Sequence, residues 1–238
     1  PDCAIFSDTG WEPKHVYVHL ARLQETCKTH DFPLHVVSKG NLKDDVLREI
    51  KKEGKGGSKP HPPFYTTGKD GKGAPLWRKC TEDYKILPIR RFIRGLLPKG
   101  GTAEQWFGIS LDEAQRMRDS RVRYITHRYP LIDMRMDRHN CQQWLERAGW
   151  GDTPRSACLG CPYHSNQLWR EMRSATPDEW SDTVTFDKAL REQPYPGTNN
   201  HVYLHRDLLP LDEIDLSSER DRGQMDLFGE ECEGMCGV

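Results

Sequence analysis

The sequence lacks the long apolar runs of a membrane protein. No stretch approaches the roughly 18 consecutive apolar residues that cross a bilayer, and mean hydropathy is −0.82. No secretory signal pattern is present either. The chain opens on Pro1 rather than Met, within a stretch that resembles a strand. We therefore expect a cytoplasmic protein that makes no membrane contact and whose natural N-terminal segment precedes Pro1.

The sequence also lacks an excess of either charge. Lys and Arg number 35, Asp and Glu 36, and the formal net charge is −1 over 238 residues. No global basic field attracts the chain to nucleic acid, although local basic patches remain open. The length suits one sizeable domain, alone or with a small appendage.

Cysteine, by contrast, is plentiful. A disulfide framework is one interpretation, but disulfide-dense chains are usually small and rich in loops. The length and the charged, helix-rich composition favour a reducing compartment in which cysteines bind metal or do redox chemistry. The eight are Cys3, Cys27, Cys80, Cys141, Cys158, Cys161, Cys232 and Cys236.

The first fifty residues alternate between strand and helix patterns. Residues 3–7 form a short apolar run, and Pro13 stands at a favourable early position of the helix that follows. Residues 34–37 predict a second strand, and residues 44–53 a helix. This rhythm indicates an α/β fold with a parallel sheet.

Further elements follow less regularly. Residues 54–75 have loop composition. Ser110 and Glu113 form a capping-box pattern, and Asn140 is the expected cap of a later helix. We predict helices at 84–97 (interrupted at Pro88), 112–118, a stretch opening at Asn140, 166–173 and 177–191, extended segments at 105–109, 129–134 and 202–204, and a loose tail after 217.

Three consecutive residues follow the first strand. Ligands of open α/β sheets bind at the carboxyl ends of the strands. There Asp8 and Thr9 would contact a ribose or adenine edge, and Gly10 would let the backbone approach closely. The alternative is a plain strand-to-helix turn.

A basic segment lies further along the chain. Arg78, Lys85, Arg90 and Arg94 stand on or before one predicted helix, and their charge suits phosphate or sulfate. The alternative is a solvated basic face.

The most specific pattern is Cys158-Leu159-Gly160-Cys161. Two thiolates two residues apart can hold one metal centre, and zinc, iron–sulfur and redox pairs all use this spacing. A metal site needs about four ligands, and Cys80 and Cys141 are the best additions, unless Cys141 is a buried helix residue. The absence of a His pair at zinc-finger spacing favours iron–sulfur, while His139 or His164 could complete a zinc site. In the tail, Cys232 and Cys236 could reach an active site, pair with each other, or be incidental.

Together these motifs resemble the phosphoadenylyl-sulfate reductase family of the PP-loop superfamily, over residues 1–191. The resemblance is carried by Asp8-Thr9-Gly10 with Glu12-Pro13, by Arg78-Lys79-Cys80-Thr81 with Lys85 and Arg94, and by Trp106-Phe107-Gly108-Ile109-Ser110 with Arg116. Uncharacterised phage and bacterial relatives are more similar still, in the stretch from Tyr129 to Tyr163.

The resemblance implies a Rossmann-like PP-loop domain, of the adenine nucleotide alpha hydrolase-like type, at residues 1–128. A helical, cysteine-containing extension at 129–216 and a flexible tail at 217–238 would follow. Implied ligands are ATP or adenylyl sulfate, bound by Asp8, Thr9, Gly10, Arg78, Lys85, Arg90, Arg94 and Arg116, and a [4Fe–4S] cluster, with zinc as alternative, on Cys80, Cys141, Cys158 and Cys161.

The implied chemistry is that of an adenylyl-sulfate reductase, with Cys232 as nucleophile, or of an ATP-dependent sulfurtransferase. A thiol reductant or sulfur-donor protein would be the partner, and nucleic acid is a candidate substrate. Three departures stand out: Lys79 replaces a paired cysteine, no Ser-Gly-Gly-x-Asp-Ser phosphate loop is present, and the tail diverges after Cys232. The competing function is a zinc-stapled, non-catalytic module that binds nucleic acid or a protein, with Trp77, Trp106 and Trp169 available for base stacking.

Overall fold

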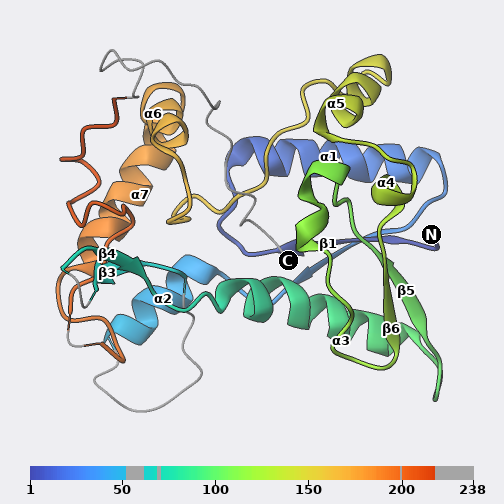
Figure 1. Ribbon diagram of the computed structural model, residues 1–238, viewed down its shortest axis with the longest axis horizontal. Helices are drawn as coiled ribbons and strands as arrows, with labels where there is room; N and C mark the ends of the chain where they lie inside the picture. Colours follow the sequence, from blue (N-terminus) through green and yellow to red (C-terminus); the bar gives the residue numbers. More distant parts are fainter. Residues whose placement is uncertain (52–61, 69–70, 199, 218–238) are drawn as a thin grey trace.

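The computed structural model describes residues 1–51, 62–68, 71–198 and 200–217. Within these residues the chain is a mixed α/β protein that contains two short parallel strand pairs, one antiparallel hairpin and several helices (Figure 1). The predicted α/β class is therefore confirmed at this level. The tail from 218 onwards, with Cys232 and Cys236, lies outside the described residues.

The first parallel pair is formed by β1 (Ala4–Asp8) and β2 (Leu34–Ser38), in a register that aligns Ala4 with Leu34. Helix α1 (Lys14–Thr29) connects them, and α2 (Leu42–Lys51) follows β2. The strand–helix–strand prediction is confirmed here. Pro13 immediately precedes α1, where its missing N–H costs nothing because the first helical donors are unpaired anyway.

A long helical segment packs against this pair. The segment starts at Cys80, passes through a π-helix, η1 (Glu82–Ile86), and continues as α3 (Leu87–Leu96), with Pro88 in the first turn of α3. Phe92 of α3 contacts His35 of β2, with 4.7 Å between ring centroids. The predicted interruption is thus a change of helix type just before Pro88, and π-turns are frequent at functional sites.

The second parallel pair, β5 (Ala103–Trp106) and β6 (Ile125–Arg128), is joined by a 3₁₀ helix, η2 (Leu111–Arg116). The strand predicted at 105–109 therefore begins earlier and ends at Trp106. The expected Ser110 capping box is wrong, since the Ser110 side chain makes no capping hydrogen bond to η2. η2 is a 3₁₀ helix with a kink at Glu113, and its tight geometry differs from the α-helical first turn on which that motif depends.

Two further expectations in this region are wrong. Residues 130–133 form a short helix, α4 (Pro130–Asp133), rather than an extended segment, because Pro130 occupies a favourable first-turn position. Helix α5 (Arg138–Arg147) is capped by Asp137. Asn140 is instead the third residue of the helix, and its side chain completes the capping box by accepting from the Asp137 N–H.

The C-terminal helices α6 (Asn166–Ala175) and α7 (Pro177–Leu190) agree with the sequence prediction. Against them lies a hairpin of β3 (Tyr65–Thr67) and β4 (Gly73–Pro75), within a stretch expected to be loop. The strand expected at 202–204 is reduced to one bridge between Tyr203 and Tyr65.

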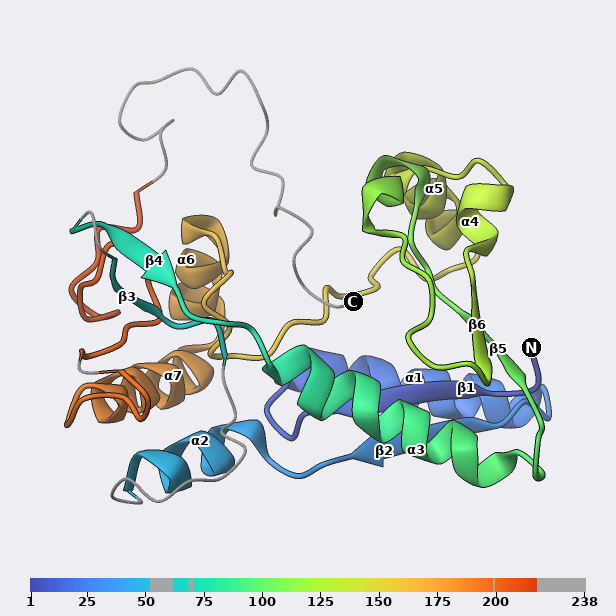
Figure 2. The same ribbon diagram turned by 60° about the horizontal axis from the view of Figure 1, so that its bottom comes forward.

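The main hydrophobic core lies among α2, α6, α7 and the segments that cover them (Figure 2). Trp169 and Leu190 are fully buried at its centre. The buried Asp187 carboxylate accepts hydrogen bonds from the backbone N–H groups of Leu204 and Leu211, at 3.2 and 2.9 Å, and pairs with Arg191. This carboxylate fastens the last described segment to α7.

Among the helices of the described ranges, none combines the length and the apolar character needed to cross a bilayer.

Candidate functional site: a cavity lined by three thiols and two cations

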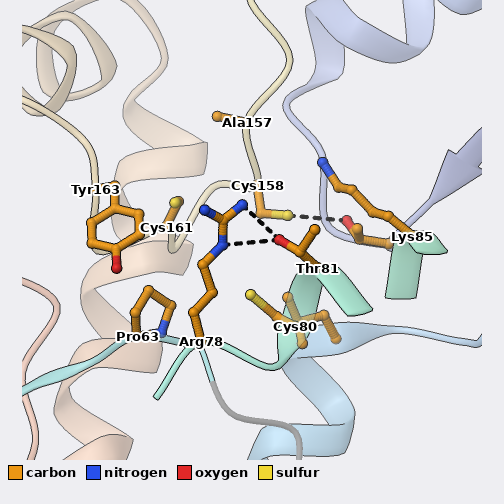
Figure 3. A pocket seen from close by; sticks show the side chains of 11 residues that line it. Pro63, Arg78, Cys80, Thr81, Lys85, Ala157, Cys158, Cys161 and Tyr163 are labelled. Atoms are coloured by element: carbon orange, nitrogen blue, oxygen red, sulfur yellow. Dashed lines mark hydrogen bonds between the residues drawn. The ribbon is translucent and has the colours of Figure 1, made fainter. Parts of the chain in front are cut away.

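A small cavity of about 40 Å³ opens beside the carboxyl end of β1 (Figure 3). It brings together three of the four cysteines that the sequence predicted as ligands, two of the predicted cations and one residue of the turn after β1. We call it the thiol cavity. Its lining is Thr9, Leu42, Pro63, Arg78, Cys80, Thr81, Lys85, Ala157, Cys158, Cys161 and Tyr163.

The cysteines reach the cavity from two segments far apart in the chain. Cys80 stands just before η1, and Cys158 and Cys161 lie in the turns that precede α6. In Figure 3 the Arg78 side chain lies between Cys161 on one side and Cys80 on the other. The Cys161 N–H donates to the Cys158 carbonyl at 3.1 Å, which closes the turn between these two residues.

The turn containing Cys158 and Cys161 is fixed against the loop after β1. The Leu159 N–H donates to the Trp11 carbonyl at 3.0 Å. The Trp11 ring covers Gly160 so closely that a Cβ there would lie 2.1 Å from ring atom Cη2. Glycine at this position is therefore required by close packing.

Cys158 lies beside a buried carboxylate. Its Sγ donates to Glu12 Oε1 at 3.6 Å and lies 3.3 Å from Thr9 Oγ1. Thr9 also donates to the same Glu12 oxygen at 2.9 Å, and Glu12 is only 3% exposed. Burial and the charge of Glu12 raise the pKa of the Cys158 thiol to about 12, against the opposing influence of Lys85. Cys158 is therefore a neutral thiol at pH 7, and the Glu12 carboxylate accepts its hydrogen bond.

Cys80 lies in a more cationic part of the cavity. Burial raises the pKa of its thiol, while the charges of Arg78 and Lys85 lower it. The Arg78 guanidinium donates to Thr81 Oγ1 from both Nε and Nη2, at 2.9 and 2.6 Å, and lies 5.8 Å from the centre of the Tyr163 ring. These contacts hold a planar cation at the cavity wall.

His164 contacts the backbone of the turn that contains Cys158 and Cys161. A ring nitrogen, Nε2, lies 2.9 Å from the Cys158 carbonyl oxygen. Burial lowers the pKa of His164 to about 4, so the ring is neutral at pH 7 and donates this hydrogen bond. Its role here is to position the backbone, and it does not line the cavity. His139, the other candidate zinc ligand, lies on α5 beside Gln143.

Other predicted residues lie elsewhere. Cys141 is on α5, and it does not line the cavity; burial and the nearby Asp112 and Asp137 raise the pKa of its thiol. Arg94 packs on Tyr124, with 5.3 Å between its guanidinium carbon and the ring centre. Arg116 pairs with Glu113 at 2.6 Å. Like these two, Arg90 is not part of the lining.

The turn after β1 has mostly a structural role. Asp8 Oδ1 accepts hydrogen bonds from the Gly10 N–H at 2.7 Å and from the Tyr17 hydroxyl at 2.9 Å. Gly10 has φ +71, and a Cβ there would lie 2.8 Å from Asn41 Cα. Only Thr9 of the three turn residues lines the cavity, so the plain-turn alternative describes Asp8 and Gly10 best.

The donor chemistry of the cavity fits a thiophilic metal or an iron–sulfur cluster. Within the part of the chain that the structure describes, however, no three or more Cys, His, Asp or Glu side chains are grouped closely enough to hold a metal ion. The three thiols share one cavity without forming a ready coordination sphere. Metal binding would therefore require Cys80 and the 158–161 turn to approach each other.

Sequence reasoning gave Glu12, Thr81 and Tyr163 no role at the site. Glu12 directly precedes the proline that opens α1, a signal of a chain turning sharply beside a strand end. Tyr163 follows Cys161-Pro162 directly, and Thr81 follows Cys80. All three belong to the motifs that carry the resemblance, but the motifs did not indicate which side chains these residues would contact. Compared with known proteins, the chain matches no family model, no curated protein and no solved structure.

Proposed function

We propose that this chain is a phosphoadenylyl-sulfate reductase-like enzyme of PP-loop, Rossmann-like architecture that binds ATP or adenylyl sulfate and acts in sulfur or nucleotide transfer. One observation carries the proposal: three thiols and two cations line one cavity beside the carboxyl end of a parallel strand. Ligands of open α/β sheets bind at this edge. The motif resemblance, carried in part by the same residues, also supports the proposal.

Arg78 and Lys85 supply the anion site. A guanidinium and an ammonium in a partly buried cavity suit the phosphate or sulfate of the nucleotide, because charge-assisted hydrogen bonds are strong there. Arg90, Arg94 and Arg116 are removed from this role, since none of them lines the cavity. Thr9 and Thr81 offer hydroxyls at its wall.

The thiols of Cys80, Cys158 and Cys161 would hold the metal group. Bound there, a [4Fe–4S] cluster or zinc ion would supply redox or Lewis-acid chemistry beside the anion site. Thiols must lose their protons to ligate metal. Glu12 Oε1 accepts from the Cys158 thiol, so it is placed to take that proton; the transfer would leave a thiolate on Cys158 and a neutral carboxyl on Glu12.

Nucleotide binding tests the anion site. We expect Arg78→Met and Lys85→Met each to raise the Kd of ATP or adenylyl sulfate about tenfold or more, as loss of a charge-assisted hydrogen bond implies. Arg90→Met and Arg94→Met are matched controls with the same charge change and should alter the Kd less than about twofold. Isothermal titration of all four variants measures this. Equal losses in the controls would refute the assignment.

The reductase and sulfurtransferase versions differ in their dependence on the tail. A reductase with Cys232 as nucleophile predicts that Cys232→Ser abolishes turnover of an adenylyl sulfate, whereas nucleotide affinity stays unchanged. Cys236→Ser is the matched control. Full turnover by the Cys232 variant would exclude the reductase version and leave sulfur transfer.

One observation favours the second candidate, a zinc-stapled binding module without catalysis. The cavity volume of about 40 Å³ suits a single ion or a few water molecules better than a cluster. Metal analysis separates the two functions, because zinc without iron, sulfide or nucleotide binding is the expected result for the module alone.

A further inference from the structure

Positive charge is concentrated in two stretches of the chain, 84–103 and 114–132. Together they contain ten Lys and Arg residues and one acidic residue, Asp119. Because the whole chain has a net charge of −1, all other residues together have a net charge of −10. A nearly neutral protein thus carries a strongly basic region, the local patch that composition alone left open.

The two stretches meet in space. The guanidinium of Arg94, on α3, lies 5.3 Å from the ring of Tyr124, in the loop before β6. In both ribbon views the C-terminal half of α3 lies beside β5 and β6 (Figures 1 and 2). We call this region, made of α3 and the segment 117–128, the basic surface.

Most arginines of the basic surface face solvent. Arg91, Arg94, Arg121, Arg123 and Arg128 are all exposed. Among the described residues, no ion pair involves any of these five, in contrast to Arg116, Arg22 and Arg191, which have carboxylate partners. Asp119 is the one carboxylate in the segment 117–128, so the cations far outnumber it and repel each other, and an anionic partner would lower this electrostatic cost.

An aromatic side chain accompanies this charge. Trp106 is 50% exposed at the end of β5, and it is the direct cross-strand partner of Arg128 in β6. Along both strands exposure alternates, so Trp106 and Arg128 stand on the same solvent-facing side. A flat, half-exposed indole beside a guanidinium is suited to stack on an unpaired base while the cation contacts phosphate.

We propose that the basic surface binds single-stranded nucleic acid. Arginine forks match phosphate oxygens, and Trp106 offers a base-stacking platform that an acidic polypeptide would not use. The site is separate from the thiol cavity, because none of the five arginines named above lines that cavity. The inference therefore does not rest on the proposed nucleotide chemistry.

Fluorescence anisotropy of the 238-residue chain with labelled 20-nucleotide single-stranded RNA and DNA tests the charge contribution. We expect binding that weakens steeply between 50 and 200 mM KCl. Arg121→Glu/Arg123→Glu should raise Kd about tenfold or more and lower the salt slope by about two, as expected from two lost phosphate contacts. The control Lys28→Glu/Lys51→Glu makes the same charge change at exposed positions outside the surface and should alter Kd less than about threefold.

A second pair of measurements tests the stacking. Trp106→Leu keeps an apolar side chain and should weaken oligonucleotide binding about fivefold or more, since stacking contributes roughly 1–3 kcal/mol per base. Polyglutamate of equal length should bind more weakly than the oligonucleotide and be unaffected by this substitution. No oligonucleotide binding at 50 mM KCl, or an equal loss in the lysine control, would overturn the proposal. Polyglutamate binding as tight as the oligonucleotide, with no effect of Trp106→Leu, would assign the surface to an acidic protein instead.

Discussion

The thiol cavity and the basic surface handle charge in opposite ways. Around the cavity, charged and polar groups are set against buried partners, as Glu12 is against Cys158 and Thr9. On the basic surface the arginines point to solvent, and between residues 103 and 150 only Ile109, Ser110 and Ile125 are buried. Where many residues are buried, as around the cavity, polar and reactive side chains can be kept from water by buried partners. Where few residues are buried, as around the basic surface, charged side chains remain in contact with solvent.

The largest expected effect comes from changing the packing beside the thiol cavity, and a matched change in α3 provides the control. Gly160→Ala would place a Cβ 2.1 Å from the Trp11 ring, so the ring or the cysteine turn must move. We expect a loss of about 3 kcal/mol in the free energy of unfolding, at the upper end of overpacking costs. Urea unfolding monitored by tryptophan fluorescence measures it.

Gly95 provides the matched control in α3. A Cβ there meets no atom within 4 Å. Gly95→Ala should therefore stabilise the protein by roughly 0.5–1 kcal/mol, the usual gain for alanine in a helix. If both variants were equally stable, the close fit between Trp11 and the cysteine turn would be disproved.

A smaller effect is expected from pH. The pKa of His164 is lowered to about 4 by burial, below its ordinary value of 6.5. Below pH 6.5 the His164 ring binds a proton in the unfolded chain but stays neutral in the folded chain. The stability present above pH 6.5 is therefore lost as the pH falls towards 4. Because the ring is only partly buried, we expect this loss to be about 2 kcal/mol.

His164→Gln isolates this contribution. Glutamine retains an N–H donor for the Cys158 carbonyl but does not titrate. Urea unfolding at pH 7.5 and pH 4.5 should show a pH-dependent loss of stability about 2 kcal/mol smaller in the variant than in the wild type. An identical pH dependence in both proteins would mean that His164 is not held neutral by its surroundings.

Sequence reasoning located the elements whose periodicity is strong. In the first fifty residues, short apolar runs alternate with helical patterns, and these gave β1, α1, β2 and α2. Helices α6 and α7 are long enough for their helical pattern to be recognised. The four-residue helix α4 and the three-residue strands β3 and β4 contain too few residues to express a period. Their conformations depend on neighbours that are distant in the sequence.

The residues of the candidate site could be predicted only in part, because the sequence indicates local conformation better than contacts between distant segments. Cys158, Cys161 and Cys80 stand in turns or at a helix start, where one short segment determines the direction of each side chain. Helical spacing could place Arg90 and Arg94 on a face but could not say which neighbour that face meets. Cys141 shares a helix face with Trp144 and Leu145, yet no residue of α5 is buried, so the apolar pattern there did not indicate a path into the core.

Metal content of cysteine variants tests the central claim most directly. After anaerobic purification, iron, sulfide and zinc would be measured per chain for the wild type and for Cys80→Ser, Cys158→Ser, Cys161→Ser and Cys141→Ser. We predict that the first three substitutions each lower the metal content per chain, because loss of a thiolate ligand weakens metal binding about tenfold or more, whereas Cys141→Ser leaves the content unchanged. A wild-type chain without metal, or a Cys80 variant that retains it while the Cys141 variant loses it, would contradict the three-thiol site.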